Sequence, residues 1–151
     1  MTFATGGKGD SDVVYDVLGK KTMGAIRGGI SNCAHLSQTL VLKSLESSSF
    51  SEEKRQKFEV LKARALKVKE VLENEKYDDA WTFYPFNAGY FMCLRLKSVN
   101  AEALRKHILE KYGVGVISVG DTDVRVAFSC TEVDDIQELF DLIYQGVQDL
   151  A

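Results

Sequence analysis

Two arginines are the residues whose type and position could bind a substrate. Arg125 lies in a segment with strand-like alternation, where Val124 and Val126 share one face and Arg125 lies on the other. Its guanidinium is charged at any working pH, and its planar fork matches a carboxylate that accepts two parallel hydrogen bonds. If that face is covered, Arg125 needs an anion. The alternative is an exposed strand arginine paired with Asp121 or Asp123.

Arg27 is the second candidate, and it lies in the glycine-rich segment 25–32. Glycine and asparagine in such a segment are typical of a turn, and composition alone favours a solvated loop arginine there. Segment 6–9 also carries glycines, on both sides of Lys8, but it lacks the complete pattern of a phosphate-binding P-loop. Turn glycines are the better interpretation of that segment.

Metal binding and nucleophilic catalysis find little support in the sequence. The only histidines are His35 and His107, and neither lies in a CxxC or HExxH motif, so we predict no metal site. His107 falls on the charged side of an amphipathic helix, which is typical of a surface histidine. A Cys–His nucleophile pair stays open, because its partners need only be close in space. Three widely spaced cysteines indicate free thiols in a reducing cytoplasm.

Composition excludes two classes of partner. The 151 residues carry a net charge of -3, and the basic residues between 54 and 69 alternate with glutamates, as on a solvated helix face. No basic stripe is left to bind phosphates, so we expect no nucleic-acid partner. Apolar runs are shorter than the ~20 residues of a membrane span, so we expect no membrane partner.

The elements that must position these residues change character near residue 48. The first part predicts a helix from residue 11 to about 21, a tight turn over 23–32 and a helix over 36–46. A long helix is then expected over 52–74. Its predicted buried stripe consists of Phe58, Leu61, Ala65, Val68 and Leu72.

Short strands and helices alternate in the second part. In chain order we expect an extended run over 81–84, a strand over 89–96, a helix over 101–112 capped by Asn100 and ended by Gly113, strands over 114–119 and 124–128, and a last helix with an apolar stripe from Ile136 to Leu150. This order predicts an α+β fold with helices on one side of a small sheet. Residues 52–151 are expected to fold around this sheet as one compact unit, whereas residues 1–48 do not look self-sufficient.

Three motifs, taken in their order along the chain, resemble those of a known family. They are Ile26-Arg-Gly-Gly-Ile-Ser-Asn32 followed by Leu36-Ser-Gln38, Pro85-Phe-Asn-Ala-Gly-Tyr-Phe-Met92, and Gly113-Val-Gly-Val-Ile-Ser-Val-Gly120 followed by Val124-Arg-Val-Ala-Phe-Ser129. Together they resemble the second half of fold-type-I enzymes that use pyridoxal 5'-phosphate (PLP), specifically class I/II aminotransferases. The resemblance covers the whole chain. It implies the family's small C-terminal α+β domain over 49–151, with a short, mainly antiparallel sheet, and a remnant of the large PLP-binding domain with an interface helix over 1–48.

The resemblance also implies roles for both arginines. Arg125 matches the residue that binds the substrate α-carboxylate. Arg27 matches a residue that reaches the neighbouring subunit's site and binds a side-chain carboxylate, although Gly28 and Gly29 depart from the family pattern. The full-length enzyme would use PLP to transfer an amino group between an amino acid and a 2-oxo acid. It would form a homodimer, and the isolated chain would self-associate through residues 26–38.

The lysine that forms the Schiff base with PLP is expected to be absent from this chain. Lys8 is the only candidate near its start, and it stands between glycines with no Ser or Thr immediately before it. We therefore predict no catalytic residue, no cofactor-binding residue, no PLP bound by this chain and no activity of the isolated chain. The alternative is a non-catalytic α+β module that binds amino or keto acids through Arg125, or that serves in assembly.

Overall fold

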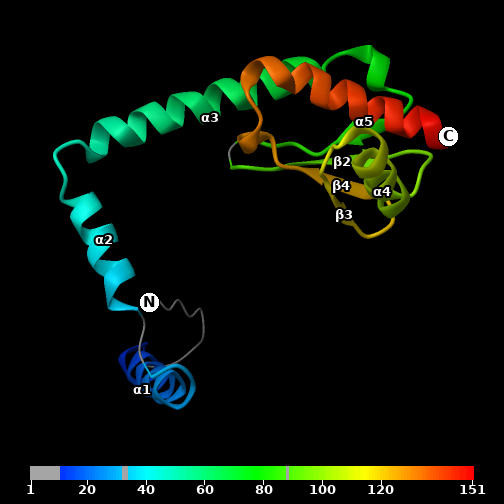
Figure 1. The fold of residues 1–151 in the computed structure, drawn as a ribbon. Helices are drawn as coiled ribbons and strands as arrows, with labels where there is room; N and C mark the ends of the chain where they lie inside the picture. The colour runs from blue at the N-terminus through cyan, green and yellow to red at the C-terminus, as the bar shows by residue number, and fades with distance from the viewer. Residues whose placement is uncertain (1–10, 32–33, 88) are drawn as a thin grey trace. The chain divides into compact units, whose positions relative to one another are not determined.

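The structure is a computed structural model that describes residues 11–31, 34–87 and 89–151. It divides into two compact units, residues 1–50 and 51–151 (Figure 1). The first contains α1 (Ser11–Gly29) and α2 (His35–Leu45). The second contains the following elements: α3 (Phe50–Leu72, which begins at the boundary), η1 (Glu75–Tyr77), β1 (Trp81–Phe83), β2 (Met92–Leu96), α4 (Ala101–Tyr112), β3 (Ile117–Val119), β4 (Asp123–Val126), η2 (Phe128–Cys130), η3 (Val133–Asp135) and α5 (Ile136–Leu150).

Helix α1 runs past the point where the sequence predicted its end. A tight turn was expected over 23–32, but the helix continues to Gly29. Glycine inside a helix costs only about 1 kcal/mol relative to alanine, which does not stop this helix at Gly24. The helix ends where Ser31 takes a positive φ of 69° and its N–H donates to the Ile26 carbonyl at 2.8 Å. For its described residues, the predicted turn is therefore wrong.

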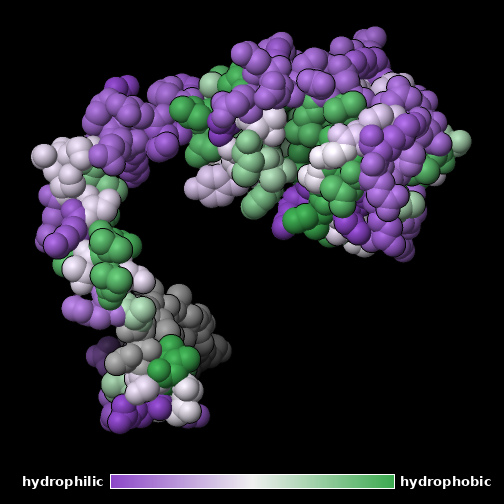
Figure 2. Space-filling model, in the orientation of Figure 1, coloured by the Kyte–Doolittle hydropathy of each residue, from purple (hydrophilic) through white to green (hydrophobic). Residues whose placement is uncertain are grey.

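The two helices of the first unit bury no side chain. Helix α2 confirms the helix predicted over 36–46, shifted by one residue at each end. Its apolar residues are exposed, Leu36 to 71% and Leu40 to 60%, and Figure 2 shows this apolar surface. Exposed apolar surfaces of this kind are typical of protein interaction sites.

Helix α3 is buried only toward its C-terminal end. Val68, Val71 and Leu72 are buried in the core of the second unit. Phe58, which the sequence placed on the buried stripe, is 58% exposed, and no residue of α3 before Val68 is fully buried. The predicted burial of the stripe was therefore wrong for the N-terminal half of the helix. Spacing identifies an apolar face, but it does not show how much of that face meets a partner.

The second unit is built on a four-stranded antiparallel sheet in the order β1-β2-β4-β3. Strands β2 and β3 start later than predicted, at Met92 and Ile117. Met92 pairs with Val126, the last residue of β4, so the residues before Met92 have no partner strand. Alternation reports which way side chains face, whereas a strand also needs a backbone partner. Phe128, predicted in a strand, lies in the 3-10 helix η2.

One face of the sheet carries the core. Met92, Leu94 and Leu96 from β2 alternate toward it, and Val124 and Val126 from β4 do the same. Helices α4 and α5 pack against each other and contribute to this core (Figure 1). The remaining large buried residues are Leu104 and Ile108 of α4 and Ile136, Phe140, Ile143 and Val147 of α5. The predicted α+β fold, with a short antiparallel sheet and helices on one side, is confirmed.

The contact of α4 with α5 requires a glycine. A Cβ built on Gly146 would lie 2.2 Å from Ile108 Cγ2 and 3.1 Å from Leu104 Cδ1. Each of these distances is shorter than a relaxed contact between carbon atoms. The absence of a side chain at residue 146 therefore lets the two helices approach closely.

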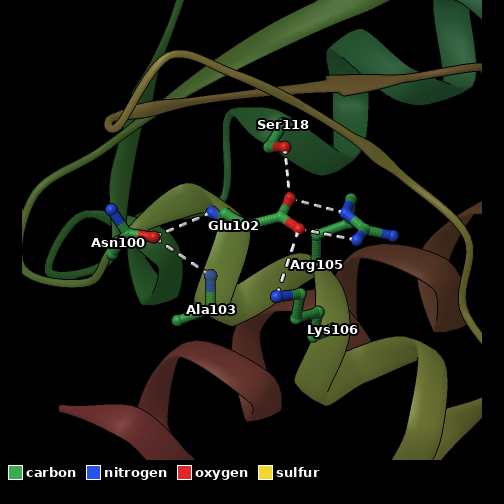
Figure 3. A network of polar contacts seen from close by, with 6 residues as sticks. All are labelled: Asn100, Glu102, Ala103, Arg105, Lys106 and Ser118. Carbon is green, nitrogen blue, oxygen red and sulfur yellow. Dashed lines mark hydrogen bonds and ion pairs between the residues drawn. The ribbon is translucent and has the colours of Figure 1, made fainter.

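The ends of α4 are set by the residues that the sequence predicted. Asn100 Oδ1 accepts hydrogen bonds from the backbone N–H groups of Glu102 and Ala103, at 3.0 and 3.1 Å (Figure 3). At the other end, Gly113 takes a φ of 70° and closes the helix. Both capping predictions are confirmed.

A carboxylate then ties α4 to β3. Glu102 accepts two hydrogen bonds from Arg105, both at 2.7 Å, and one from Ser118 Oγ of β3 at 2.6 Å (Figure 3). The hydrogen bonds from Arg105 and then from Ser118 lower the pKa of Glu102 to about 2. This network fixes the helix against the outer strand beside β4.

Candidate functional site

Strand β4 holds Arg125 on the sheet face opposite the core. Val124 and Val126 point into the core, so the alternation of the strand turns Arg125 to the other side. Its register partners are Cys93 in β2 and Ile117 in β3. Arg125 therefore lies on an inner strand, with a paired strand on each side. The predicted position of its side chain, mid-strand and away from the core, is confirmed.

An aromatic ring holds the guanidinium of Arg125. The Cζ atom lies 4.7 Å from the centre of the Phe91 ring, a cation–π contact. The Nε atom is buried, and it has no hydrogen-bond partner among the residues that the structure describes. A buried N–H without a partner costs free energy unless something accepts its hydrogen bond. The guanidinium is therefore oriented by packing rather than by an internal acceptor.

The pairing of Arg125 with Asp121 or Asp123 is not found. The Asp123 carboxylate accepts a hydrogen bond from the Tyr84 hydroxyl at 3.2 Å. Asp121 faces the α4 N-terminus, where its carboxylate lies 3.5 Å from the Asn100 side-chain nitrogen. Within residues 11–31, 34–87 and 89–151, Arg125 forms no ion pair, so its charge is available to an external anion.

The segments before β2 and after β4 are connected through the backbone of Ser129. The backbone N–H of Ser129 donates to the carbonyl of Tyr90 at 3.4 Å, so the segment after β4 is connected to the segment before β2. Arg64 of α3 donates to the carbonyl of the same Ser129. Phe128, fully buried, packs against Phe86 with ring centres 5.6 Å apart.

A groove lies next to this region. It has a volume of about 420 Å³ and lies between α3 and residues Asn87, Gly89 and Tyr90, with an apolar lining and two lysines. Its lining residues on α3 are Phe58, Leu61, Lys62, Ala65, Leu66 and Lys69. The Lys69 ammonium lies 5.5 Å from the centre of the Phe86 ring, so this charge forms a cation–π contact.

Arg27 lies in the first unit, in the last turn of α1. Its Nη1 atom donates to Ser31 Oγ at 2.8 Å, and its side chain is exposed. Because α1 continues through this segment, Arg27 lies on a helix rather than in the predicted loop. Arg27 and Arg125 belong to different units and are each described within their own unit.

The remaining chemistry-bearing residues do not gather into a site. Lys8 lies outside the described residues, as does Cys33. His107 is partly exposed, and its Nε2 lies 2.7 Å from Asp149 Oδ2. Cys93 and Cys130 are free thiols. In the described part of the chain, no three His, Cys, Asp or Glu residues come together as a metal site.

Two residues of the site were missed by the sequence analysis. Phe91 was assigned only to a strand face, because the register that brings it to Arg125 is a long-range property. Arg64 was included in the solvated face of a charged helix. Its position, three residues after Leu61 and four before Val68, is on the apolar side of that helix and could have identified it.

Comparisons with known proteins agree with this architecture. The family model "Aminotransferase class I and II" matches residues 19–143. A search of the curated proteins found no match.

Two solved structures share the fold. One is LysN, an alpha-aminoadipate aminotransferase from Thermus thermophilus, complexed with N-(5'-phosphopyridoxyl)-L-leucine; it is 21% identical, with a TM-score of 0.74 over 89% of this chain and 36% of that chain. The other is an aminotransferase from Anaerococcus prevotii, 19% identical, with a TM-score of 0.69 over 92% of this chain and 33% of that chain. The chain thus spans about a third of the length of each. No helix of the described residues is long and apolar enough to cross a membrane.

The match to the family model covers most of the chain, and it includes the strand that carries Arg125 and the helices packed against that strand. The chain belongs to the class I and II aminotransferase family.

Proposed function

We propose that the full-length protein is a PLP-dependent aminotransferase that moves an amino group between an amino acid and a 2-oxo acid, and that Arg125 binds the α-carboxylate of both. The observation that carries this proposal is the state of Arg125. It is a charged guanidinium, oriented by Phe91, that has no carboxylate partner among the described residues. A bidentate carboxylate matches this fork. It would orient the substrate, which is the main contribution of a positioning group to the rate.

PLP does not fit the part of the chain that the structure describes. The cofactor needs a lysine for its aldehyde together with groups that bind its phosphate and its ring. The lysines of the groove, Lys62 and Lys69, lie over the rings of Phe58 and Phe86 in an apolar setting. Lys8 lies outside the described residues. We therefore assign PLP to the full-length enzyme, where it supplies the electron sink for the reaction, and we expect the isolated chain to be inactive.

The two units suggest a division of roles. We assign residues 49–151 to the small domain of the enzyme, and residues 1–48 to a part of the large PLP-binding domain that ends in an interface helix. The exposed apolar residues of α2 support self-association, with a second copy of the chain as the partner. In such a dimer, Arg27 would bind the side-chain carboxylate of a substrate in the neighbouring subunit. The free thiols Cys93 and Cys130 favour the cytoplasm.

A titration of the isotopically labelled chain tests the role of Arg125. A single bidentate arginine contributes about 1.5–3 kcal/mol, so we expect acetate to shift the NMR signals of Arg125 and of its register partners Cys93 and Ile117 with a dissociation constant of roughly 10–100 mM. An amino acid should bind no more tightly than acetate, because the partner of its amino group belongs to the full-length enzyme. Addition of PLP followed by borohydride should leave no stoichiometric adduct on the chain.

The matched variants are Arg125→Lys and Arg95→Lys. Arg95 lies on the same sheet face but is exposed, so its replacement should leave the titration unchanged, whereas Arg125→Lys should abolish the acetate shift of the neighbouring Cys93 and Ile117 backbone signals. An unchanged titration in Arg125→Lys would refute the proposed role. Selective, submillimolar binding of an amino acid would instead support the binding-module alternative, and an adduct on Lys8 would contradict the assignment of PLP to other parts of the enzyme.

A further inference from the structure

Arg64 is a mostly buried arginine that the proposed carboxylate binding does not use. It lies in α3, with its side chain only 13% exposed. Its Nη1 atom donates to the carbonyl of Ser129, and its Nη2 atom donates to Glu132 Oε1 at 2.7 Å. Its Nε atom is buried and has no hydrogen-bond partner among the described residues. Burying a charge is costly unless it is paired, so the position of this guanidinium requires an explanation.

One contact of Arg64 is to the backbone of Ser129, which is also bonded to the segment that carries Phe91. The carbonyl of Ser129 accepts from Arg64, and the N–H of the same residue donates to Tyr90. Tyr90 immediately precedes Phe91, whose ring lies 4.7 Å from the Arg125 guanidinium. Ser129 itself follows Arg125 by four residues. One continuous path of contacts therefore leads from α3 through Ser129 and Tyr90 to both sides of Arg125.

Glu132 is a weaker partner than the Ser129 carbonyl. The Glu132 side chain is 74% exposed, and an exposed ion pair contributes little to stability. The bond to the Ser129 carbonyl is partly buried and comes from a charged donor, which makes it the stronger contact. The function of Arg64 therefore depends on its hydrogen bond to the Ser129 carbonyl rather than on its ion pair with Glu132.

We infer that Arg64 is a positioning residue for Arg125: it holds the backbone of Ser129 and, through that residue, keeps the Phe91 ring under the guanidinium that binds the substrate carboxylate. This inference rests on the proposed function for its consequence in catalysis, but the geometric coupling can be tested without it. Arg64 does not touch the substrate. Its effect is to keep Arg125 in one orientation, so that a carboxylate does not have to order the side chain when it binds.

The test follows the Nε–Hε group of Arg125 by NMR of the whole chain. Because this group is buried, its hydrogen should exchange slowly with water in the wild-type chain. In Arg64→Met we expect the exchange rate to rise about tenfold and the acetate affinity to fall by a similar factor, since the ring and the peptide are released. Arg64→Lys keeps one donor for Ser129 and should show a smaller rise.

Three control variants separate positioning from general stability. Glu132→Gln removes the ion pair and should leave the exchange of Arg125 unchanged. Lys67 lies on the same helix and forms an ion pair with Glu70, which is also in α3. Lys67→Met should have no effect on the exchange of Arg125. Asp149→Asn should destabilise the ends of α4 and α5, where Asp149 contacts Lys111, His107 and Tyr112, without changing Arg125.

Each outcome decides between the two proposals. A folded Arg64→Met chain with wild-type exchange at Arg125 overturns the positioning role. If Arg64→Met does not fold, Arg64→Leu takes its place, because leucine also lacks a donor for the Ser129 carbonyl, and wild-type exchange at Arg125 in that variant overturns the role equally. Slow exchange that depends on Arg64, together with no acetate shift at Arg125, would refute carboxylate binding and leave the positioning role standing.

Discussion

The two units of this chain stabilise their helices in different ways. Helices α1 and α2 bury no residue, although α1 is longer than either α4 or α5. Helices α4 and α5 bury a face against the sheet, and that face includes Leu104, Ile108, Phe140 and Ile143. In proteins, most helix stability comes from packing of an amphipathic face rather than from local propensity. The difference indicates that α1 and α2 are suited to pack against a surface outside their own unit.

The largest contrast should appear in core and surface truncations. Phe140→Ala removes a fully buried ring from α5, and we expect it to lower the free energy of unfolding by about 3–5 kcal/mol. Leu40→Ala in α2 removes a side chain that is 60% exposed, and its effect should stay within about 0.5 kcal/mol. Urea unfolding measures both when it is followed by far-UV circular dichroism, which reports the helices of the two units. Equal losses in the two variants would mean that α2 packs in solution as tightly as α5.

Glycine substitutions sharpen the same comparison at smaller scale. Gly146→Ala would place a methyl group 2.2 Å from Ile108 Cγ2, so overpacking should cost about 1–3 kcal/mol despite the better helix propensity of alanine. The matched change Gly24→Ala lies in α1, where no described atom comes within 4 Å of the added Cβ. There, propensity alone should act and raise the helix content. Circular dichroism during thermal unfolding distinguishes the destabilising effect of Gly146→Ala from the gain of helix in Gly24→Ala. A stabilised Gly146→Ala chain would contradict the close approach of α4 and α5.

The smallest effect concerns the pH dependence of the second unit. The pKa of Glu102 is lowered from its ordinary value of 4.5 to about 2, so the folded state favours its charged form. Its contribution to stability is therefore present above pH 4.5 and is lost as the pH falls toward 2. Glu102→Gln should destabilise the chain at neutral pH, and the difference from wild type should shrink across that interval.

Glu110→Gln provides the control for this titration, because Glu110 is an exposed carboxylate on the same helix. It should leave the acid side of the stability curve unchanged. A Glu102→Gln chain that follows the wild-type curve between about pH 5 and pH 2 would show that the contacts from Arg105 and Ser118 do not stabilise the folded state in solution.

The elements with strong local signals could be predicted from the sequence. Asn100 and Gly113 marked both ends of α4 correctly, because a cap is a property of a few adjacent residues. The alternation around Val124 gave the orientation of Arg125 for a similar reason. Failures occurred where distant residues decide: Gly24 does not interrupt α1, and Phe58 lacks the partner that its spacing suggested.

The site itself could be predicted only in part. Arg125 was found by its charge in an apolar strand, but Phe91 and Arg64 depend on contacts between segments far apart in the sequence. Patterns within one helix cannot show that Arg64 bonds to Ser129, 65 residues away. The position of a charge beside an apolar stripe was a usable signal. That signal predicts a buried arginine, but it does not identify the acceptor that offsets the cost of burying the charge.

The sheet ends at both sides in strands of three residues, β1 and β3, each with one paired neighbour. Long free edges are the usual starting points for uncontrolled polymerisation, since their unpaired backbone groups can capture another strand. Edges this short offer few such groups. In the proposed self-association, the apolar helices of the first unit would therefore form the contact, and the short edges of the sheet would add little to it.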